Sequence, residues 1–218
     1  MLPIRDANPH RSFPVVNAGL IALCSLLWLY QVSLPEERMQ ELVESYGLVP
    51  SEFFQRPQTL VTHMFLHGGW LHIIGNMWFL WVFGDNVEDR LGRVRYLLFY
   101  LLSGLGAALI QAFVSLLFGG ESVPMVGASG AISGVLGAYL WLFPRARILA
   151  LVPVFFFMTL MEVPAVFFIG MWVLIQVVNG LITLPHLSMG GVAWFAHIGG
   201  FVVGYLVVKK LYRRALYT

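Results

Sequence analysis

Charged side chains are scarce in this chain of 218 residues. Asp, Glu, Lys and Arg together make up 11% of it, whereas apolar residues make up 59% and the mean hydropathy is +0.79. Soluble domains carry about 25% charged residues, so this scarcity excludes an ordinary soluble globular protein. The composition predicts a protein that crosses a membrane several times.

Cysteine is nearly absent as well, because Cys24 is the only one in the chain. A single thiol excludes an intrachain disulfide, and we interpret Cys24 as a small buried apolar side chain. The formal net charge is +2 at pH 7 without a basic stripe, so nucleic acid is not an expected partner. Low-complexity tracts and internal repeats are also lacking, and we treat 1–218 as a single membrane domain.

Long apolar segments dominate the rest of the sequence. A helix needs about 20 residues to cross the hydrocarbon layer, and we expect an all-α protein with six such helices. Their approximate ranges are 15–34, 68–84, 95–118, 128–143, 163–183 and 191–208. The apolar segment 148–160 is too short for a seventh crossing and contains Pro153. We expect it to lie in the membrane interface or to extend a neighbouring helix.

Basic residues are distributed unevenly between the two sides of such a six-helix arrangement. Eleven of the 13 fall on one side, namely Arg5, Arg11, Arg90, Arg93, Arg95, Arg145, Arg147, Lys209, Lys210, Arg213 and Arg214. Because Lys and Arg are retained in the cytoplasm, both termini are predicted to be cytoplasmic. In the outer connection, apolar positions with helical spacing predict a helix over Glu36 to Tyr46, lying along the outer surface.

Four polar side chains in these spans are candidates for a functional site. Ser129 opens the fourth span, His72 and Asn76 lie one turn apart in the second, and His197 lies in the sixth. A rise of about 1.5 Å per residue places the last three at similar depths. The fourth span is short, so either the bilayer thins or the loop before Ser129 dips inward. Polar groups at such depth are unfavourable by roughly 2–3 kcal/mol and are retained mainly where they are used or paired.

Glycines indicate that the fourth and sixth spans touch. Gly130 and Gly134 form one pair at i and i+4, and Gly200 and Gly204 form another. This spacing lets membrane helices approach backbone to backbone.

A contact between these two spans would place His197 within hydrogen-bond reach of Ser129, as a general base must be. His72, the Asn76 amide and backbone N–H groups near Ser129 are candidate donors to an oxyanion. No acidic residue is expected at this depth, so the predicted catalytic set is a dyad.

Taken together, these motifs resemble the rhomboid family of intramembrane serine proteases. The resemblance rests on His-Gly-Gly at 67–69, His-x-x-x-Asn at 72–76, Gly-Ala-Ser-Gly at 127–130, Ala-His-Ile-Gly-Gly at 196–200 and Gly204. It implies that Ser129 is the nucleophile, that His197 is its base, and that His72 and Asn76 contribute to the oxyanion hole. It also implies cleavage of transmembrane segments of other proteins in a lipid bilayer, without a cofactor. The segment 3–14 resembles prokaryotic members with a six-helix core, which suggests an inner or plasma membrane, and the oligomeric state is not indicated.

Two positions depart from the family's pattern. Many members have Trp-Arg in the first outer loop where this chain has Gln58-Thr59, with Arg56 nearby. Some members have an aromatic residue four positions after the nucleophile, where this chain has Ser133. Support for the histidine ring is then expected from Phe201 or Trp194.

Other interpretations of the same residues stay open at this point. His63, His67 and His72 could ligate zinc, although no His-Glu-x-x-His motif is present. Ser129 could be a small packing residue, and His197 could be a hydrogen-bonded contact between helices. The chain could also be a catalytically silent rhomboid-like protein that binds membrane clients, although such a protein would be expected to lack Ser129 or His197. A transporter is disfavoured, since charged residues at mid-depth in two repeated halves would be expected.

Overall fold

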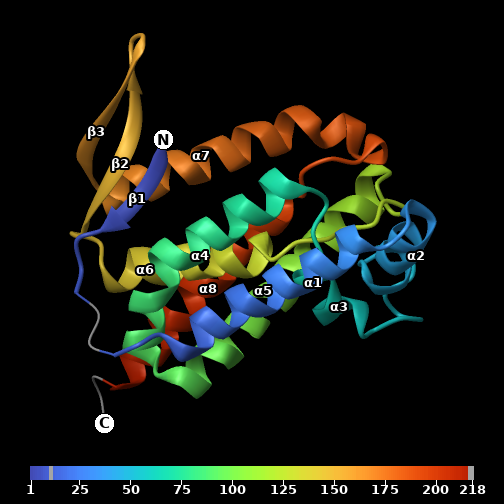
Figure 1. Ribbon diagram of the computed structural model, residues 1–218, viewed down its shortest axis with the longest axis horizontal. Helices are drawn as coiled ribbons and strands as arrows, with labels where there is room; N and C mark the ends of the chain where they lie inside the picture. Colours follow the sequence, from blue (N-terminus) through green and yellow to red (C-terminus); the bar gives the residue numbers. More distant parts are fainter. Residues whose placement is uncertain (10–11, 216–218) are drawn as a thin grey trace.

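The computed structural model describes residues 1–9 and 12–215, with side chains up to Tyr212, so Arg11 lies outside the described residues. Long helices form a bundle, and a small sheet lies at one end of it (Figure 1). The long helices are α1 (Val15–Ser33), α4 (Trp70–Leu91), α5 (Arg93–Phe118), α6 (Ser129–Leu142), α7 (Ala165–Thr183) and α8 (Trp194–Ala215). Shorter elements are α2 (Glu36–Tyr46), α3 (Thr59–Thr62) and the 3-10 helices η1 (His63–Phe65) and η2 (Leu184–Met189).

Each long helix overlaps one of the segments expected from apolarity, although α8 begins at Trp194 and continues past the expected end at 208 to Ala215. Four described helical stretches are long and apolar enough to cross a membrane, namely α1, α5, α7 with η2, and α8. The apolar helix α6 is shorter, with 14 residues. Helix α4 continues past the expected end at 84 to Leu91. Its hydrogen bonding persists through the charged residues between 85 and 90, and the helix ends where Gly92 adopts φ +77°. The chain is therefore a mostly helical, multi-pass membrane protein.

The expected helix over Glu36 to Tyr46 is confirmed as α2. Its first turn carries Glu36 and Glu37, whose negative charge is favourable near the N–H groups at a helix N-terminus. Its position along the outer surface stays a prediction.

A three-stranded antiparallel sheet shows that the all-α prediction was incomplete. Strand β2 (Arg147–Val154) pairs with β3 (Phe157–Pro164) on one side and with β1 (Leu2–Asp6) on the other. The alternative in which 148–160 extends a helix is wrong, because this segment forms a β-hairpin. Pro153 disfavours a helix there, and the third strand comes from the distant N-terminal segment, so local periodicity did not reveal the pairing.

Asp6 ties β1 to the helices beside it. Its carboxylate accepts hydrogen bonds from the Tyr139 hydroxyl of α6 at 2.7 Å and from the Asn86 amide of α4 at 2.9 Å. Burial raises the pKa of the Asp6 carboxyl above its ordinary value, against the opposing effect of these hydrogen bonds. The sheet is thus fixed at the end of the bundle where α8 also ends, which we call the terminal end (Figure 1).

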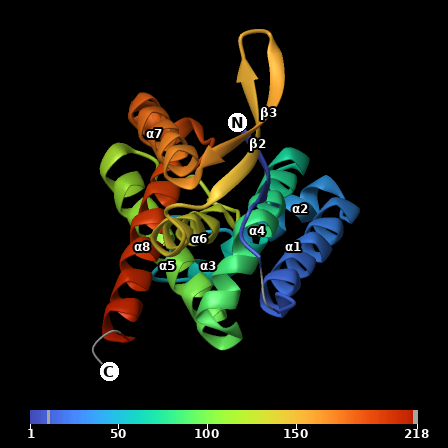
Figure 2. The same ribbon diagram turned by 90° about the vertical axis from the view of Figure 1, so that its left-hand side faces the viewer.

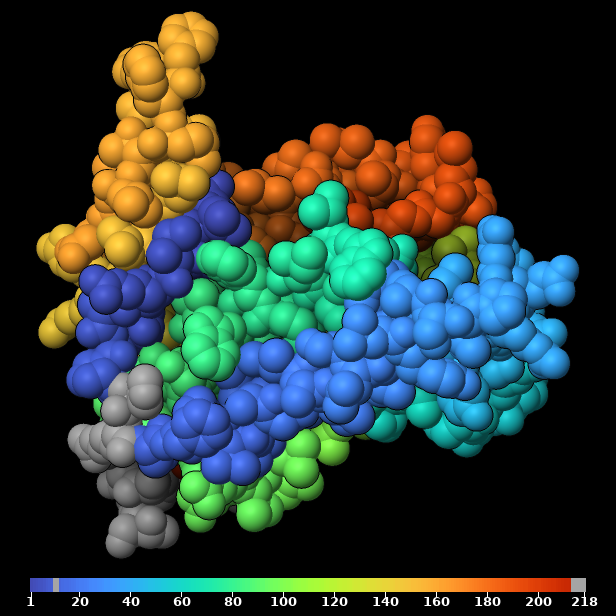
Figure 3. All heavy atoms as spheres, in the orientation of Figure 1, coloured from blue at the N-terminus to red at the C-terminus, as the bar shows by residue number. Residues whose placement is uncertain are grey.

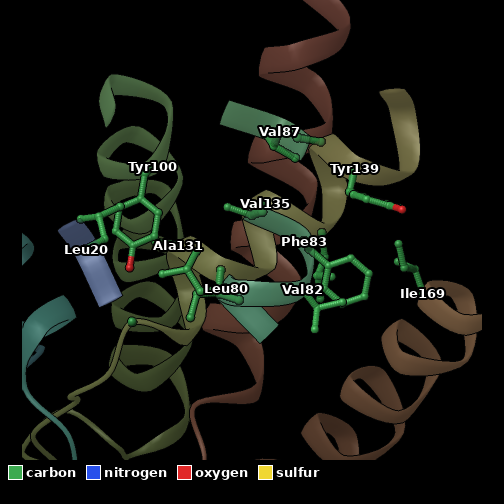
Figure 4. Packing of buried hydrophobic residues seen from close by; sticks show 14 of the residues in the cluster. Leu20, Leu80, Val82, Phe83, Val87, Tyr100, Ala131, Val135, Tyr139 and Ile169 are labelled. Atoms are coloured by element: carbon green, nitrogen blue, oxygen red, sulfur yellow. The ribbon is translucent and has the colours of Figure 1, made fainter. Parts of the chain in front are cut away.

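Helix α6 lies in the middle of the bundle, since all its residues from 130 to 139 are buried. Figure 4 shows Ala131, Val135 and Tyr139 of this helix among side chains from α4 and α5. This central position explains why a helix of 14 residues is so apolar on all sides.

Helices α6 and α8 pack backbone to backbone, which confirms the contact expected from their glycines. A Cβ added to Gly200 would collide with the carbonyl oxygen of Gly130, and one on Gly204 would collide with that of Gly134. Any larger residue at these positions would push the helices apart. The small residues therefore set the separation between the helix that carries Ser129 and the helix that carries His197.

Candidate active site

The loop 119–128 delivers the chain to Ser129 at the start of α6. Backbone hydrogen bonds attach this loop to the first connection, which is the segment between α1 and α4. Leu48 and Met125 exchange N–H···O bonds of 2.9 and 2.8 Å, and the Gly127 N–H donates to the His63 carbonyl at 2.9 Å. Gly127 has φ +129°, a conformation that favours glycine. These contacts hold the turn before Ser129 in one place.

The structure brings Ser129 and His197 together across the α6–α8 interface. His197 lies in the first turn of α8, and its Nε2 is 2.8 Å from the Ser129 Oγ. The distance matches that of an O–H···N hydrogen bond. Both side chains are half-buried and line the same cavity.

Gln176 of α7 contacts the other nitrogen of the His197 ring. Its Nε2 donates to the Trp172 carbonyl at 3.0 Å, so its Oε1 faces His197 Nδ1 at 2.8 Å. An amide oxygen accepts only, so this contact requires the proton of a neutral ring on Nδ1. Nε2 is then free to accept the hydrogen of Ser129.

Sequence reasoning missed Gln176. The signal was present, because this glutamine is a strongly polar side chain within the apolar helix α7 and is 4% exposed. The test of polarity at membrane depth that selected the four candidate residues also applies to it.

Two tryptophans flank the His197 ring. The ring centroids of Trp194 and Trp172 both lie 6.0 Å from that of His197, the first in an edge-on and the second in a tilted arrangement. Trp194 was one of the two residues expected in this role, whereas Phe201 stacks on Tyr205 instead. Trp172 was not anticipated from the sequence.

The positions that depart from the family's pattern have local partners. The Ser133 hydroxyl donates to the Ser129 carbonyl at 2.6 Å and so bonds within α6. In the first connection, the Thr59 hydroxyl donates to the Arg56 carbonyl at 2.7 Å, and the Arg56 guanidinium donates to the Glu44 carbonyl at 3.0 Å. Arg56 thereby links this part of the connection to α2.

His72 and Asn76 lie on the other side of the Gly127 turn. The Gly68 N–H donates to His72 Nδ1 at 3.3 Å, which leaves the proton of the neutral ring on Nε2. A Cβ at Gly127 would lie 2.7 Å from that Nε2 and 3.7 Å from Asn76 Nδ2. Among the described residues, the buried Asn76 Nδ2 finds no hydrogen-bond partner. Two donors therefore face the turn that precedes Ser129.

A cavity of about 520 Å³ joins Ser129, His197 and His72. Its lining includes His63, His72, Gln111, Ser115, Ser129 and His197 among polar residues, and Leu48, Leu71, Val123, Met125, Leu187 and Val192 among apolar ones. A mostly apolar cavity with a few convergent polar groups is typical of a binding site.

The remaining histidines between α1 and α4 have contacts of their own. His63 Nδ1 contacts the Thr59 carbonyl at 2.8 Å, and the His67 ring packs edge-on to His72 with centroids 5.2 Å apart. In the described part of the chain, no three His, Cys, Asp or Glu residues are grouped closely enough to hold a metal ion.

Comparison with known proteins identifies the family. The model of the Rhomboid domain matches residues 55–214. The putative rhomboid protease YdcA of Bacillus subtilis is 30% identical over 213 residues, which cover 94% of each chain. RHOMBOID-like protein 6, mitochondrial, of Arabidopsis thaliana is 31% identical over 155 residues, covering 67% of this chain and 41% of that protein. Rhomboid protein 1, mitochondrial, of Saccharomyces cerevisiae is 30% identical over 166 residues, covering 75% of this chain and 44% of that protein. The chain thus spans less than half the length of these two eukaryotic relatives, and it belongs to the rhomboid family.

Proposed function

We propose that this protein is an intramembrane serine endopeptidase with Ser129 as nucleophile and His197 as general base. The observation that carries the proposal is the 2.8 Å contact between Ser129 Oγ and His197 Nε2 beside a cavity of about 520 Å³. Membership of a family that includes a relative named as a protease supports it.

The reaction follows from the positions of the protons. His197 Nε2 takes the hydroxyl proton as Ser129 Oγ attacks a peptide carbonyl, and the protonated ring then gives that proton to the leaving amine. A water molecule next attacks the acyl-enzyme while Nε2 accepts its proton, which releases the carboxyl product and restores Ser129. Gln176 holds the ring in the tautomer that this sequence requires, as a positioning residue.

Three sources of hydrogen-bond donors lie around the turn before Ser129, where we expect the oxyanion to form. They are His72 Nε2, Asn76 Nδ2 and the first N–H groups of α6, which have no partner within the helix. Donors arranged in advance stabilise the charge that develops in the transition state. The unpartnered state of Asn76 Nδ2 supports this role, because a buried donor left unbonded is unfavourable by about 1–3 kcal/mol.

We further propose that the chain is one membrane domain in which all six long helices cross the bilayer and both termini are cytoplasmic. The bias of Lys and Arg toward one side supports this orientation, and β1 and the end of α8 lie at the same end of the bundle (Figure 1). The substrates would be transmembrane segments of other proteins, and the location a prokaryotic inner or plasma membrane. The mechanism uses no cofactor.

The test is covalent labelling of the protein in detergent and in liposomes by a fluorophosphonate, combined with cleavage of a reconstituted single-span substrate. A modified peptide that contains Ser129 and a cleaved substrate would support the proposal. A folded protein that binds the substrate without cleaving it or being labelled would favour the client-binding alternative.

Asn76→Ala is expected to lower kcat/KM by about 10²-fold, because one oxyanion donor of several is lost. Asn76→Asp should be impaired at least as much, since it keeps the shape but lacks the N–H. Asn179→Ala, which removes the amide of another helical asparagine in α7, serves as the matched control. Steady-state cleavage in liposomes measures all three, and wild-type activity in Asn76→Asp would contradict the donor role.

Gln176→Ala is expected to lower kcat roughly tenfold with little change in KM, which corresponds to one hydrogen bond of about 1–1.5 kcal/mol. The reason is that His197 loses the acceptor that fixes its tautomer. Gln176→Glu keeps an acceptor at the same place and should retain more activity than Gln176→Ala. Leu174→Ala, on the exposed face of α7, controls for the helix itself. A purely structural role for Gln176 would lower stability in step with activity and would show no rescue by Glu.

A further inference from the structure

The β2–β3 hairpin projects away from the helical bundle at the terminal end. Figures 1 and 2 show it extending beyond α7, and Figure 3 shows bulky side chains at its tip. Its base is anchored, because Ile148, Ala150 and Val163 belong to the buried core. Its tip is free, with Phe155 95% and Phe156 97% exposed.

Both faces of this hairpin are apolar. Between 148 and 161 the chain has a single polar side chain, that of Thr159. A two-stranded ribbon in water would alternate apolar and polar residues, since one of its faces would be solvated. Instead, Phe157, Met158 and Leu160 of β3 are all exposed. An apolar surface of this kind, outside the core of a membrane protein, indicates contact with an apolar partner.

The turn at the tip consists of two aromatic residues, although other residues would form it with less strain. Val154 pairs with Phe157, so Phe155 and Phe156 form a two-residue turn. Phe155 has φ +52°, the left-handed region, where hairpin turns usually have Gly, Asn or Asp. A bulky residue in this region is an outlier, and such outliers often mark functional positions. The chain therefore has phenylalanine in a turn whose backbone conformation glycine would adopt with less strain.

The position of the hairpin indicates which partner this is. It extends across the direction of the long helices at their terminal end (Figure 1). Where such helices cross a bilayer, an element placed in this way runs along the membrane surface. The outer edge of β3 has unpaired backbone groups, which would find no water in the hydrocarbon core. A position in the core is therefore excluded, and the hairpin fits the membrane interface. At its base, Arg145 is exposed and Arg147 lies 3.7 Å from Glu162, as expected at the level of anionic head groups.

We propose that the hairpin is a membrane-interface anchor, with the tip 154–158 inserted among the lipids beside α7. The partner is the lipid of the leaflet at the terminal end, and the proposal does not depend on catalysis. Strand β3 ends at Pro164 and α7 begins at Ala165, whose N–H donates to the Ala146 carbonyl at 2.8 Å. The anchor thereby fixes the start of the helix that carries Gln176.

The experiment places a fluorescent probe at the tip of the full-length protein. Cys24, buried and the sole thiol, is replaced by Ala, and Phe156→Cys is labelled with an environment-sensitive dye. The protein is reconstituted in vesicles of phosphatidylcholine and phosphatidylglycerol, with brominated lipids as quenchers from the membrane and iodide as the quencher from water. Phe113→Cys, on the exposed face of α5, and Glu121→Cys, in a loop, provide the lipid and water references.

The probe at 156 is expected to show blue-shifted emission and to lose intensity with brominated lipids, while iodide quenches it less than the probe at 121. Adding Phe155→Asp should reverse these changes without unfolding the protein, because the side chain is exposed. Quenching by iodide alone would overturn the proposal. Protection from both quenchers, together with cross-linking between copies through residue 156, would also overturn it and would assign the tip to a second copy of the chain.

Discussion

Ser129→Ala is expected to abolish proteolysis, with kcat/KM reduced by at least about 10⁴-fold. The variant keeps the cavity and the ring of His197 but removes the oxygen that would attack the substrate. His197→Ala is expected to lose as much, because the hydroxyl without its base 2.8 Å away is a weak nucleophile. The double variant should be no worse than either single one, since the two residues act as a unit.

The measurement is cleavage of a single-span substrate in liposomes, with thermal unfolding in detergent as a check on the fold. Ser103→Ala is the matched control. Its hydroxyl is buried in α5 without a hydrogen-bond partner among the described residues, so removing it should leave both activity and stability near those of the wild type. A cleaving Ser129→Ala protein would eliminate the proposed nucleophile.

The helices of this fold could be predicted well from the sequence, because apolar runs report directly on the membrane. The expected range 95–118 and the observed Arg93–Phe118 differ by two residues at one end. The larger errors concerned the ends of α8, expected at 208 and observed at Ala215, and of α4, expected at 84 and observed at Leu91. A charged turn at the membrane surface stays helical, and Gly92 ends it.

The hairpin could not be predicted in the same way, because its pairing is not local. β1 aligns Leu2 with Leu151 across most of the chain, and that register depends in part on the hydrogen bonds of Asp6. An apolar run such as 148–160 fits a buried helix or a strand equally well by periodicity. Only the two-residue turn and the pairing of β2 with β1 show that the run forms strands and not a helix.

The candidate site was partly predictable, because polar side chains in apolar helices are few. Ser129 and His197 were chosen on this ground, and the structure places them in contact. Gln176 satisfies the same criterion but has no counterpart in the motifs that carry the resemblance to the family. Which nitrogen of His197 it faces depends on the rotation of α7 about its axis, and a sequence does not report that angle.

Gly200→Ala is expected to destabilise the fold by about 1–3 kcal/mol through overpacking and to reduce activity by more than this loss explains. The added Cβ would meet the carbonyl oxygen of Gly130, which is backbone and cannot rotate away. Helix α8 must therefore shift relative to α6, and it carries His197 three residues before Gly200. A displacement of about 1 Å at a catalytic group is enough to lower the rate about 10²-fold.

Gly170→Ala provides the control for this effect. It lies in α7 with nothing within 4 Å of the added Cβ, so it should be neutral or slightly stabilising, because Ala favours helix more than Gly does. Thermal unfolding and cleavage are measured on both variants in the same lipid. If Gly200→Ala unfolds and cleaves like the wild type, the helices do not touch at this glycine, and the 2.8 Å contact between Ser129 and His197 must be maintained by other parts of the bundle. If only Gly200→Ala is impaired, the close approach of two glycine backbones is what places the base against the nucleophile.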